Sequence, residues 1–381
     1  TFERDSLGRI TKKTENALSG TNVYEYYYDL SGRLTSVWIN GAQSSSYSYD
    51  SNSNRISKSN SLTGTYDAQD RILSYGDYAF THNLNGDLET KTNTTTNETT
   101  TYVYDVHGNL KSVTLPDGKT IEYIIDGQNR RIARKVGGTI TRGFLYKDGL
   151  NPIAELDSSG AVVAMFVYGH KSNVPAYIVK NGNTYLVISD HLGSVRYVIN
   201  VGTNMVVQEI DYDEFGIVLK DTNPGFQPFG FAGGIYDHET KLVRFGARDY
   251  NADTGRWLSR DPILFEGGDS NLYGYVGQDP VHSVDLNGTK DGLCPNPEFC
   301  GDTDNNKPDK DNQNGICIPL PGGSLCIDKD HPEPPEGQHR DCRTFGNIKF
   351  CTDPTPIPPP DKRPKGPGVR GDNDFNDRRT C

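Results

Sequence analysis

Two aspartates, Asp261 and Asp285, stand 24 residues apart in similar local sequences, SRDPIL and SVDLNG. Two carboxylates that folding brings together can share a proton, so that one serves as a general base and the other as a general acid. Such a pair can activate water against a peptide bond. Arg248, Arg256 and Arg260 could hold one carboxylate ionised or stabilise an oxyanion. The alternative is that both aspartates are turn residues that bind backbone N–H groups.

Other polar residues give weaker indications of a site. His191, in DHLGS, has no second His or Cys at metal-ligand spacing, so a turn or packing role is favoured. The acidic stretch 302–315, DTDNNKPDKDNQNG, lacks the Gly and Glu that an EF-hand needs at its sixth and twelfth positions. It is interpreted as a solvated linker. We therefore expect no metal and no cofactor.

The residues around the aspartates follow a series of short repeats that must position them. Each repeat has Tyr-Asp, then small polar residues with Gly or Asn, and then Leu or Ile. The clear copies are YDLSGRL (28–34), YDSNSNRI (49–56), YDAQDRI (66–72) and YDVHGNL (104–110), and the weaker ones are FERDSLGRI (2–10), HNLNGDL (82–88) and IDGQNRRI (125–132). Their spacing of roughly 15–23 residues fits one β-hairpin per copy.

The repeats predict an all-β fold. Asx and Gly residues supply the turns, and the alternation in VYEYYYD and SYSYD has the period of a strand with one aromatic face. A single hairpin is marginal in water, so the hairpins must pair side by side into a continuous sheet. From about residue 144 the spacing loosens, but DSSG (157–160) and DEFG (213–216) still predict hairpin turns.

Composition changes abruptly near residue 288. All 22 tyrosines precede Gly288, whereas all seven cysteines and 15 of the 22 prolines follow it. Three regions are expected: repeats over 1–143, a further β region over 144–288 and a variable Cys/Pro-rich tail over 289–381. The net charge of −11 argues against nucleic-acid binding, and no apolar run is long enough to span a bilayer. The chain starts inside a patterned segment and is interpreted as a piece of a longer polypeptide.

The repeats, together with DHLGSVR, YDEFG, RDYNADTGRWLSRDP and NLYGYVGQDPVHSVDLNG, resemble the RHS (rearrangement hot spot) or YD-repeat family over about residues 1–288. The family includes bacterial polymorphic toxins, the shell component of insecticidal toxin complexes, and teneurins. The resemblance implies a spiral β-hairpin shell closed by an RHS-associated core plug, with residues 144–288 as that core domain and Arg248 to Gly288 as the plug. It also implies that the protein's own C-terminal segment is the enclosed cargo.

The resemblance further implies a role for Asp261 and Asp285. Self-cleaving members carry two motifs like DPxGL, whose aspartates act as an aspartyl-protease-like pair that cuts after the second motif. Here the first motif reads DPILF, and the second reads DLNGT, with Thr289 in place of the final Leu. The expected cut is close to Thr289. These departures leave open that the aspartates are turn residues only.

The tail is expected to be poorly ordered or stapled by disulfides. It has no Tyr or Trp and only four Phe, so it can bury little apolar surface. The segments CIPLPGGSLC (317–326) and CRTFGNIKFC (342–351) each read as a hairpin closed by a disulfide, which indicates an oxidising, extracellular destination. The run TPIPPPDKRPKGPG (355–368) is typical of extended polyproline.

Two functions from different classes remain. The first is an exported shell protein that carries a variable tail for toxin delivery or intercellular competition. The second is a secreted or cell-surface, teneurin-like binding or scaffold protein without catalytic activity. A secretion apparatus or a cell-surface partner could act through the missing N-terminal region.

Overall fold

The computed structural model describes residues 1–17, 20–59, 61–289 and 292–293, and the strand segments 316–320, 323–327, 338–339, 342–345, 348–351 and 355–356. Contacts divide the chain into two compact units, Thr1–Asp309 and Lys310–Cys381. Most of the tail, including the acidic stretch 302–315 and residues 357–368 of the polyproline run, lies outside the described residues.

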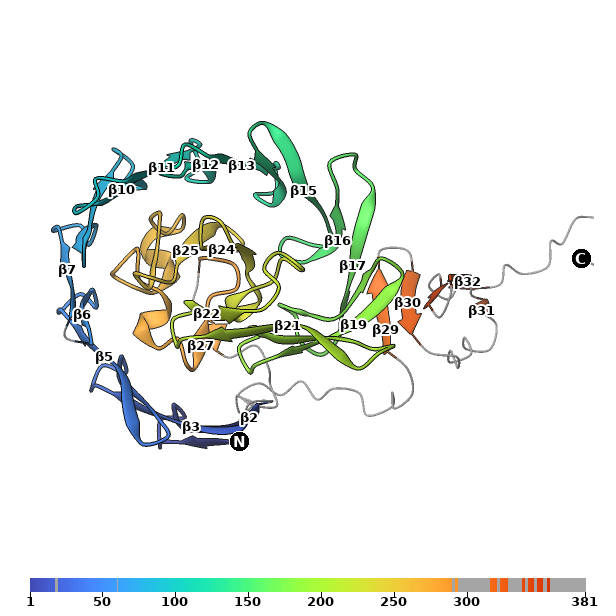
Figure 1. The fold of residues 1–381 in the computed structure, drawn as a ribbon, viewed down its shortest axis with the longest axis horizontal. Helices are drawn as coiled ribbons and strands as arrows, with labels where there is room; N and C mark the ends of the chain where they lie inside the picture. The colour runs from blue at the N-terminus through green and yellow to red at the C-terminus, as the bar shows by residue number, and fades with distance from the viewer. Residues whose placement is uncertain are drawn as a thin grey trace, which may run out of the picture. The chain divides into compact units, whose positions relative to one another are not determined.

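The first unit contains one 22-stranded antiparallel sheet, in which each strand pairs with the next along the chain (Figure 1). This confirms the all-β prediction. Its first half comprises β1 (Phe2–Arg4), β2 (Ile10–Ala17), β3 (Gly20–Tyr28), β4 (Leu34–Ile39), β5 (Ala42–Tyr49), β6 (Arg55–Lys58), β7 (Leu62–Tyr66), β8 (Ile72–Tyr75), β9 (Tyr78–His82), β10 (Leu88–Asn93) and β11 (Thr99–Tyr104). Its second half comprises β12 (Leu110–Thr114), β13 (Thr120–Ile125), β14 (Arg131–Val136), β15 (Thr139–Tyr146), β16 (Pro152–Leu156), β17 (Val162–Tyr168), β18 (Pro175–Lys180), β19 (Asn183–Ser189), β20 (Val195–Asn200), β21 (Met205–Tyr212) and β22 (Val218–Asp221).

The aspartate of the YD motif builds the turn of its hairpin. In the turn between β3 and β4, Asp29 Oδ1 accepts the backbone N–H groups of Ser31 and Arg33 at 2.9 and 3.0 Å. Its Oδ2 accepts Arg33 Nε at 2.7 Å, and Gly32 supplies the positive φ of 84° that the turn requires. The same Asp–Arg pair, four residues apart, recurs at Asp5, Asp67 and Asp126.

In most of the hairpins the tyrosine of the motif binds the hairpin before it, although the buried hydroxyl of Tyr104 has no partner among the described residues. Tyr28 and Tyr49 donate their hydroxyls to the backbone oxygens of Ile10 and Leu34, at 2.8 and 2.7 Å. Further along the sheet, Tyr66, Tyr146 and Tyr168 make the same bond to Arg55, Arg131 and Pro152. The turn arginine then stacks on the tyrosine of the next repeat, as Arg33 does on Tyr49 at 5.0 Å. The motif therefore specifies both the turn and the spacing between hairpins.

Residues 226–289, here called the inner segment, follow the large sheet and lie inside the arc that its first strands form (Figure 1). The inner segment contains the four-stranded sheet β23 (Ile235–Asp237), β24 (Leu242–Phe245), β25 (Arg248–Asn251) and β26 (Arg256–Trp257), the short strand β27 (Ser283–Val284), which pairs with β28 (Gly292–Leu293), and the 3₁₀ turns η1 (Phe231–Gly233), η2 (Leu264–Gly267) and η3 (Val276–Gln278). Its core is aromatic, with Tyr250 and Tyr275 rings 4.4 Å apart and Trp257 packed against both.

Polar side chains join the inner segment to the turns of the large sheet. Arg256 binds Asn54 Oδ1 at 2.6 Å, Arg244 binds Asn109 Oδ1 at 2.9 Å, and Tyr273 donates to Gly86 O at 2.9 Å. Asp249 bridges Arg244 and Arg131 of β14 at 3.0 and 2.8 Å, with all three side chains 2–3% exposed. Because these partners come from turns that are distant in sequence, the inner segment is held in one orientation.

In the second unit, the backbone forms the antiparallel strands β29 (Ile316–Leu320), β30 (Gly323–Ile327), β32 (Cys342–Phe345) and β33 (Ile348–Cys351), with β31 (Gln338–His339) paired to β34 (Thr355–Pro356). Cys317 lies opposite Cys326, and Cys342 lies opposite Cys351. This backbone pairing follows the register of the two predicted hairpins, and their disulfides stay a prediction. Within the described residues, no helix has the length and apolar character to cross a membrane.

Candidate functional site

The inner segment brings Asp261 and Asp285 onto one arginine. Arg248, the first residue of β25, directs Nη2 to Asp261 Oδ2 at 2.9 Å and to Asp285 Oδ2 at 3.2 Å. Asp261 follows β26 and Asp285 follows β27, and all three residues are at most 7% exposed. The fold thus brings the two aspartates together on Arg248, and their catalytic role stays a prediction. A buried arginine shared by two carboxylates offsets their mutual repulsion.

The backbone after Asp285 is bound to two of these side chains, Asp285 and Arg248. Asp285 Oδ1 accepts the N–H groups of Gly288 and Thr289 at 2.9 and 3.2 Å. Arg248 Nε donates to the carbonyl oxygen of Gly288. Gly288 has a φ of 70°, and a Cβ there would meet Phe245 O at 2.4 Å, so only glycine fits this turn. The segment predicted to contain the cut is consequently fixed beside both carboxylates.

Gly267, at the end of η2, leaves a gap between Asp261 and Thr289. A Cβ on Gly267 would lie 3.0 Å from Asp261 Oδ2 and 3.0 Å from the carbonyl oxygen of Thr289. A cavity of about 10 Å³ lies between Arg248, Asp261, Gly267 and Thr289. This is close to the roughly 10–15 Å³ that one water molecule needs. The site therefore has room for one water next to a carboxylate and a peptide carbonyl.

The surroundings of Asp261 favour its protonated form. Burial raises the pKa of Asp261, while the Arg248 guanidinium and the N–H of Ile263 oppose this shift. The N–H of Ile263 donates to Asp261 Oδ1 at 2.9 Å, which leaves Oδ2 toward Arg248 and the gap. A carboxyl whose pKa is raised is the better proton donor of a pair.

The other predicted site residues lie elsewhere. Arg256 binds Asn54 and the backbone oxygen of Asp70, and it stacks on Tyr66 at 4.8 Å, so it contacts the large sheet and not the carboxylates. Arg260 is exposed and borders, together with Asp261, a cavity of about 880 Å³ between the inner segment and the sheet turns. This cavity gives solvent a route to Asp261.

His191 is buried, and its Nε2 lies 2.7 Å from the backbone oxygen of Val281. Its ring also packs on Phe2, with a centroid distance of 4.8 Å. Burial lowers the pKa of His191. These contacts fit the packing role favoured from sequence. Among the residues whose placement is described, no three His, Cys, Asp or Glu side chains converge as a metal site.

Sequence reasoning missed Gly267 and the backbone groups of Gly288 and Thr289. Gly267 is one of a Gly-Gly pair after an apolar run, and nothing in that pattern indicates what its missing side chain leaves room for. The glycine in DLNG could have indicated the turn. An aspartate that begins a turn often accepts backbone N–H groups from the residues that follow, and such a turn often ends on a glycine with positive φ.

A sheet of YD-type hairpins that surrounds an inner segment defines a class, the YD-shell proteins. The family model described as teneurin YD-shell matches residues 1–281. The chain therefore belongs to the teneurin YD-shell family, and this confirms the predicted YD-repeat membership.

Two curated relatives illustrate the range of the family. Teneurin-4 of Mus musculus is 31% identical over 299 residues, which are 74% of this chain and 10% of that protein. The tRNA3(Ser)-specific nuclease WapA of Bacillus spizizenii is 28% identical over 257 residues, which are 64% of this chain and 11% of that protein. The chain thus spans about a tenth of the length of these relatives. Among solved structures, the crystal structure of TcdB2-TccC3 has a TM-score of 0.40 at 16% identity, covering 76% of this chain and 20% of that one.

Proposed function

We propose that this chain is part of an exported YD-shell protein that cuts itself next to Thr289 and thereby separates the tail from the shell. The observation that carries the proposal is the double ion pair of Arg248 with Asp261 and Asp285, beside the bound backbone of Gly288 and Thr289. Two carboxylates and a water-sized gap at a peptide carbonyl are the components of acid–base peptide hydrolysis.

The proposed reaction assigns one proton transfer to each carboxylate. Asp285 takes a proton from water, and the hydroxide adds to the carbonyl carbon of Thr289 while protonated Asp261 donates to the carbonyl oxygen. When the tetrahedral intermediate collapses, the bond to the nitrogen of Lys290 breaks and that nitrogen takes the proton held by Asp285. The carbonyl oxygen returns its proton to Asp261. Arg248 holds both carboxylates in place and offsets the negative charge.

The test compares Asp261→Asn and Asp285→Asn with the unchanged chain. Asparagine keeps the oxygen that accepts backbone N–H groups, so the turns should fold, but it cannot exchange a proton. We expect each change to abolish a cut that releases about a quarter of the 42.1 kDa chain. Asp117→Asn is the matched control, since Asp117 is an exposed turn residue that binds Lys119 N. Cleavage that persists in Asp261→Asn would contradict the proposal.

We propose that the released tail is a toxin that the shell protein delivers. This role implies that the protein is secreted or lies at the cell surface. The support is the relation to WapA, a protein named as a nuclease. Expression of residues 290–381 alone in the cytoplasm should then arrest growth. Unimpaired growth with the tail confirmed to be present would argue against a toxin.

A second candidate is a teneurin-like binding or scaffold protein without catalysis. It is favoured by the hydrogen bonds of the aspartates, because each Oδ1 accepts backbone N–H groups as a turn residue does. The relation to teneurin-4 also supports it. In that case the purified chain stays intact, and Asp261→Asn changes only its stability.

A further inference from the structure

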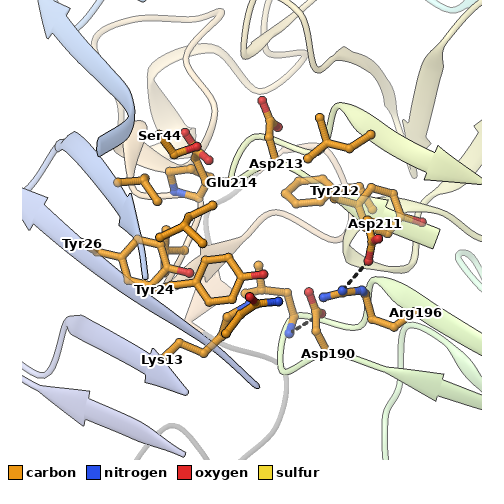
Figure 2. Close-up of a pocket in the computed structure, with 18 of the residues that line it drawn as sticks. Lys13, Tyr24, Tyr26, Ser44, Asp190, Arg196, Asp211, Tyr212, Asp213 and Glu214 are labelled. Atoms are coloured by element: carbon orange, nitrogen blue, oxygen red, sulfur yellow. Dashed lines mark hydrogen bonds and ion pairs between the residues drawn. The ribbon is translucent and has the colours of Figure 1, made fainter. Parts of the chain in front are cut away.

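A pocket of about 360 Å³ lies where the first strands of the large sheet approach its last strands (Figure 2). Its walls come from β2 to β5 on one side and from β20, β21 and the turn before β20 on the other. This volume falls in the range of roughly 300–1,000 Å³ that is typical of small-molecule sites. The pocket is separate from the Asp261 site, since the two share no lining residue.

Four carboxylates and three cations, Lys13, Arg196 and Lys220, line this pocket, and the carboxylates fall into two groups. Asp211 pairs with Arg196 at 2.6 Å, and Asp213 pairs with Lys58 at 2.9 Å. Asp190 instead accepts the N–H groups of two turn residues, and Glu214 accepts the hydroxyls of two side chains; these partners are Leu192, Ser194, Ser45 and Tyr47. Within the described part of the chain, neither carboxylate has a cation within ion-pair distance. The lining cations already have carboxylate partners, since Lys13 and Arg196 pair with Glu15 and Lys220 pairs with Glu209. The charges of Asp190 and Glu214 are therefore left without a counter-ion among the described residues.

Tyr26 adds a second and independent indication of a ligand. This side chain is 7% exposed, and its hydroxyl has no hydrogen-bond partner among the described residues. Figure 2 shows the hydroxyl directed into the pocket, with Tyr24 beside it; the two rings are stacked 6.4 Å apart. The hydroxyl oxygen of this mostly buried side chain is open to the pocket and is free to bind a polar group that enters it.

The placement of the carboxylates distinguishes between kinds of cation. A metal ion needs several oxygens around one point, and no three acidic or metal-binding side chains among the described residues meet that condition. The charges are instead distributed along the walls, with the apolar side chains of Val37, Ile39 and Leu219 also lining the pocket. Such a surface fits an elongated cation whose charges are separated by methylene groups.

We propose that this pocket binds a small organic cation with two or more ammonium groups, of the polyamine class. One ammonium group donates to Glu214 and the Tyr26 hydroxyl, and another donates to Asp190. The methylene groups between them contact the tyrosine rings and the apolar wall. Because the walls belong to strands that are far apart in sequence, the bound cation also joins the first strands of the sheet to the last ones.

The test is calorimetric titration of the full chain with spermidine in 150 mM salt, with Glu214→Gln, Asp190→Asn and Tyr26→Phe as variants. Glutamine and asparagine keep the oxygen acceptors and remove only the charge. We expect saturable one-site binding. Glu214→Gln and Asp190→Asn should each weaken the affinity about tenfold, because each removes one charge-assisted hydrogen bond to the ligand. Glu89→Gln, a change of the same kind at an exposed residue of β10, should have no effect.

Three results would overturn the proposal. The first is the absence of binding to a chain whose fold is confirmed by circular dichroism. The second is equal affinity for the Glu214→Gln and Glu89→Gln variants, because this would mean diffuse attraction to an acidic protein. The third is displacement of spermidine by an equal concentration of Mg²⁺, since a compact divalent ion does not fit separated carboxylates. A loss of affinity in Tyr26→Phe as well would place the ligand at the Tyr26 hydroxyl.

Discussion

At the scale of single residues, Arg248 holds the two aspartates of the candidate site together. Its Nη2 contacts both carboxylates and its Nε binds Gly288 O, so one side chain fixes the pair and the backbone that follows Asp285. Arginine suits this role because its planar guanidinium offers several donors in fixed directions. A lysine at this position would supply the charge but not the geometry.

Gly267→Ala tests the water-sized gap at residue scale. A methyl group at this position would stand 3.0 Å from both Asp261 Oδ2 and Thr289 O, where the proposed water lies. We expect self-cleavage to slow at least about tenfold, because a displaced water loses its position for attack. Rates are measured by gel densitometry over time. Gly143→Ala is the matched control, since its methyl group would lie 3.2 Å from Leu156 in the large sheet and lines no part of this cavity. Equal cleavage in both variants would contradict the assigned gap.

Asp279 gives a prediction about pH. Burial raises the pKa of Asp279 to about 7, against the opposing backbone N–H groups of His282 and Val281. The folded state therefore binds this proton more tightly than the unfolded state, and stability falls as pH rises from about 4 to 7. Asp279→Asn removes the charge and should raise the free energy of unfolding at pH 8 by about 2–4 kcal/mol. Urea titration at pH 4 should show almost no gain; a gain of equal size there would refute the assignment.

At the scale of elements, the hairpin repeat combines a turn, an ion pair and a hydrogen bond to the previous hairpin. Tyr49→Phe removes only the bond from Tyr49 to Leu34 O. We expect the free energy of unfolding to fall by about 1–2 kcal/mol, because the Leu34 carbonyl loses its hydrogen-bond partner in a partly buried position. Tyr78→Phe is the control, since the Tyr78 ring is 36% exposed and contacts Lys91 through its face. Denaturant unfolding of the two variants measures the difference; identical midpoints would show that the hydroxyl bond contributes nothing.

The sequence predicted these elements well because their determinants are local. Asp29, Gly32 and Arg33 lie within one turn, and each contact between them spans at most four residues. Long-range contacts carry no such pattern: Tyr47 binds Glu214, 167 residues away, and Arg131 binds Asp249, 118 residues away. For the same reason, the sequence suggested three arginines for the site, whereas the fold brings only Arg248 to the carboxylates. Arg256 instead joins the inner segment to the sheet.

The cysteine hairpins provide a second prediction at this scale. Directly opposed residues in an antiparallel pair have Cα atoms about 4.5–5.5 Å apart, and a disulfide needs roughly 4.4–6.8 Å. The register places Cys317 opposite Cys326 and Cys342 opposite Cys351. We therefore expect these two disulfides in protein recovered after export. Non-reducing peptide mapping checks both pairs, and free thiols at all four positions would refute the prediction.

At the scale of the whole first unit, the large sheet and the inner segment depend on each other. The sheet alone would leave the turn residues Asn54 and Asn109 without Arg256 and Arg244, and the inner segment alone would leave Asp249 without Arg131. Breaking one side of such buried pairs is costly, because the remaining partner is left buried without its counter-charge or its hydrogen bond. The site at Asp261 is thus positioned by the complete assembly and not by the inner segment alone.

The intact mass of the purified, unaltered chain, measured over a long incubation, tests the central claim most directly. The claim is that Asp261 and Asp285 cut the chain next to Thr289. We predict two masses whose sum equals the chain plus one water, with Thr289 as the new C-terminal residue of the larger fragment. A single unchanged mass, from protein that circular dichroism shows to be folded, would contradict it.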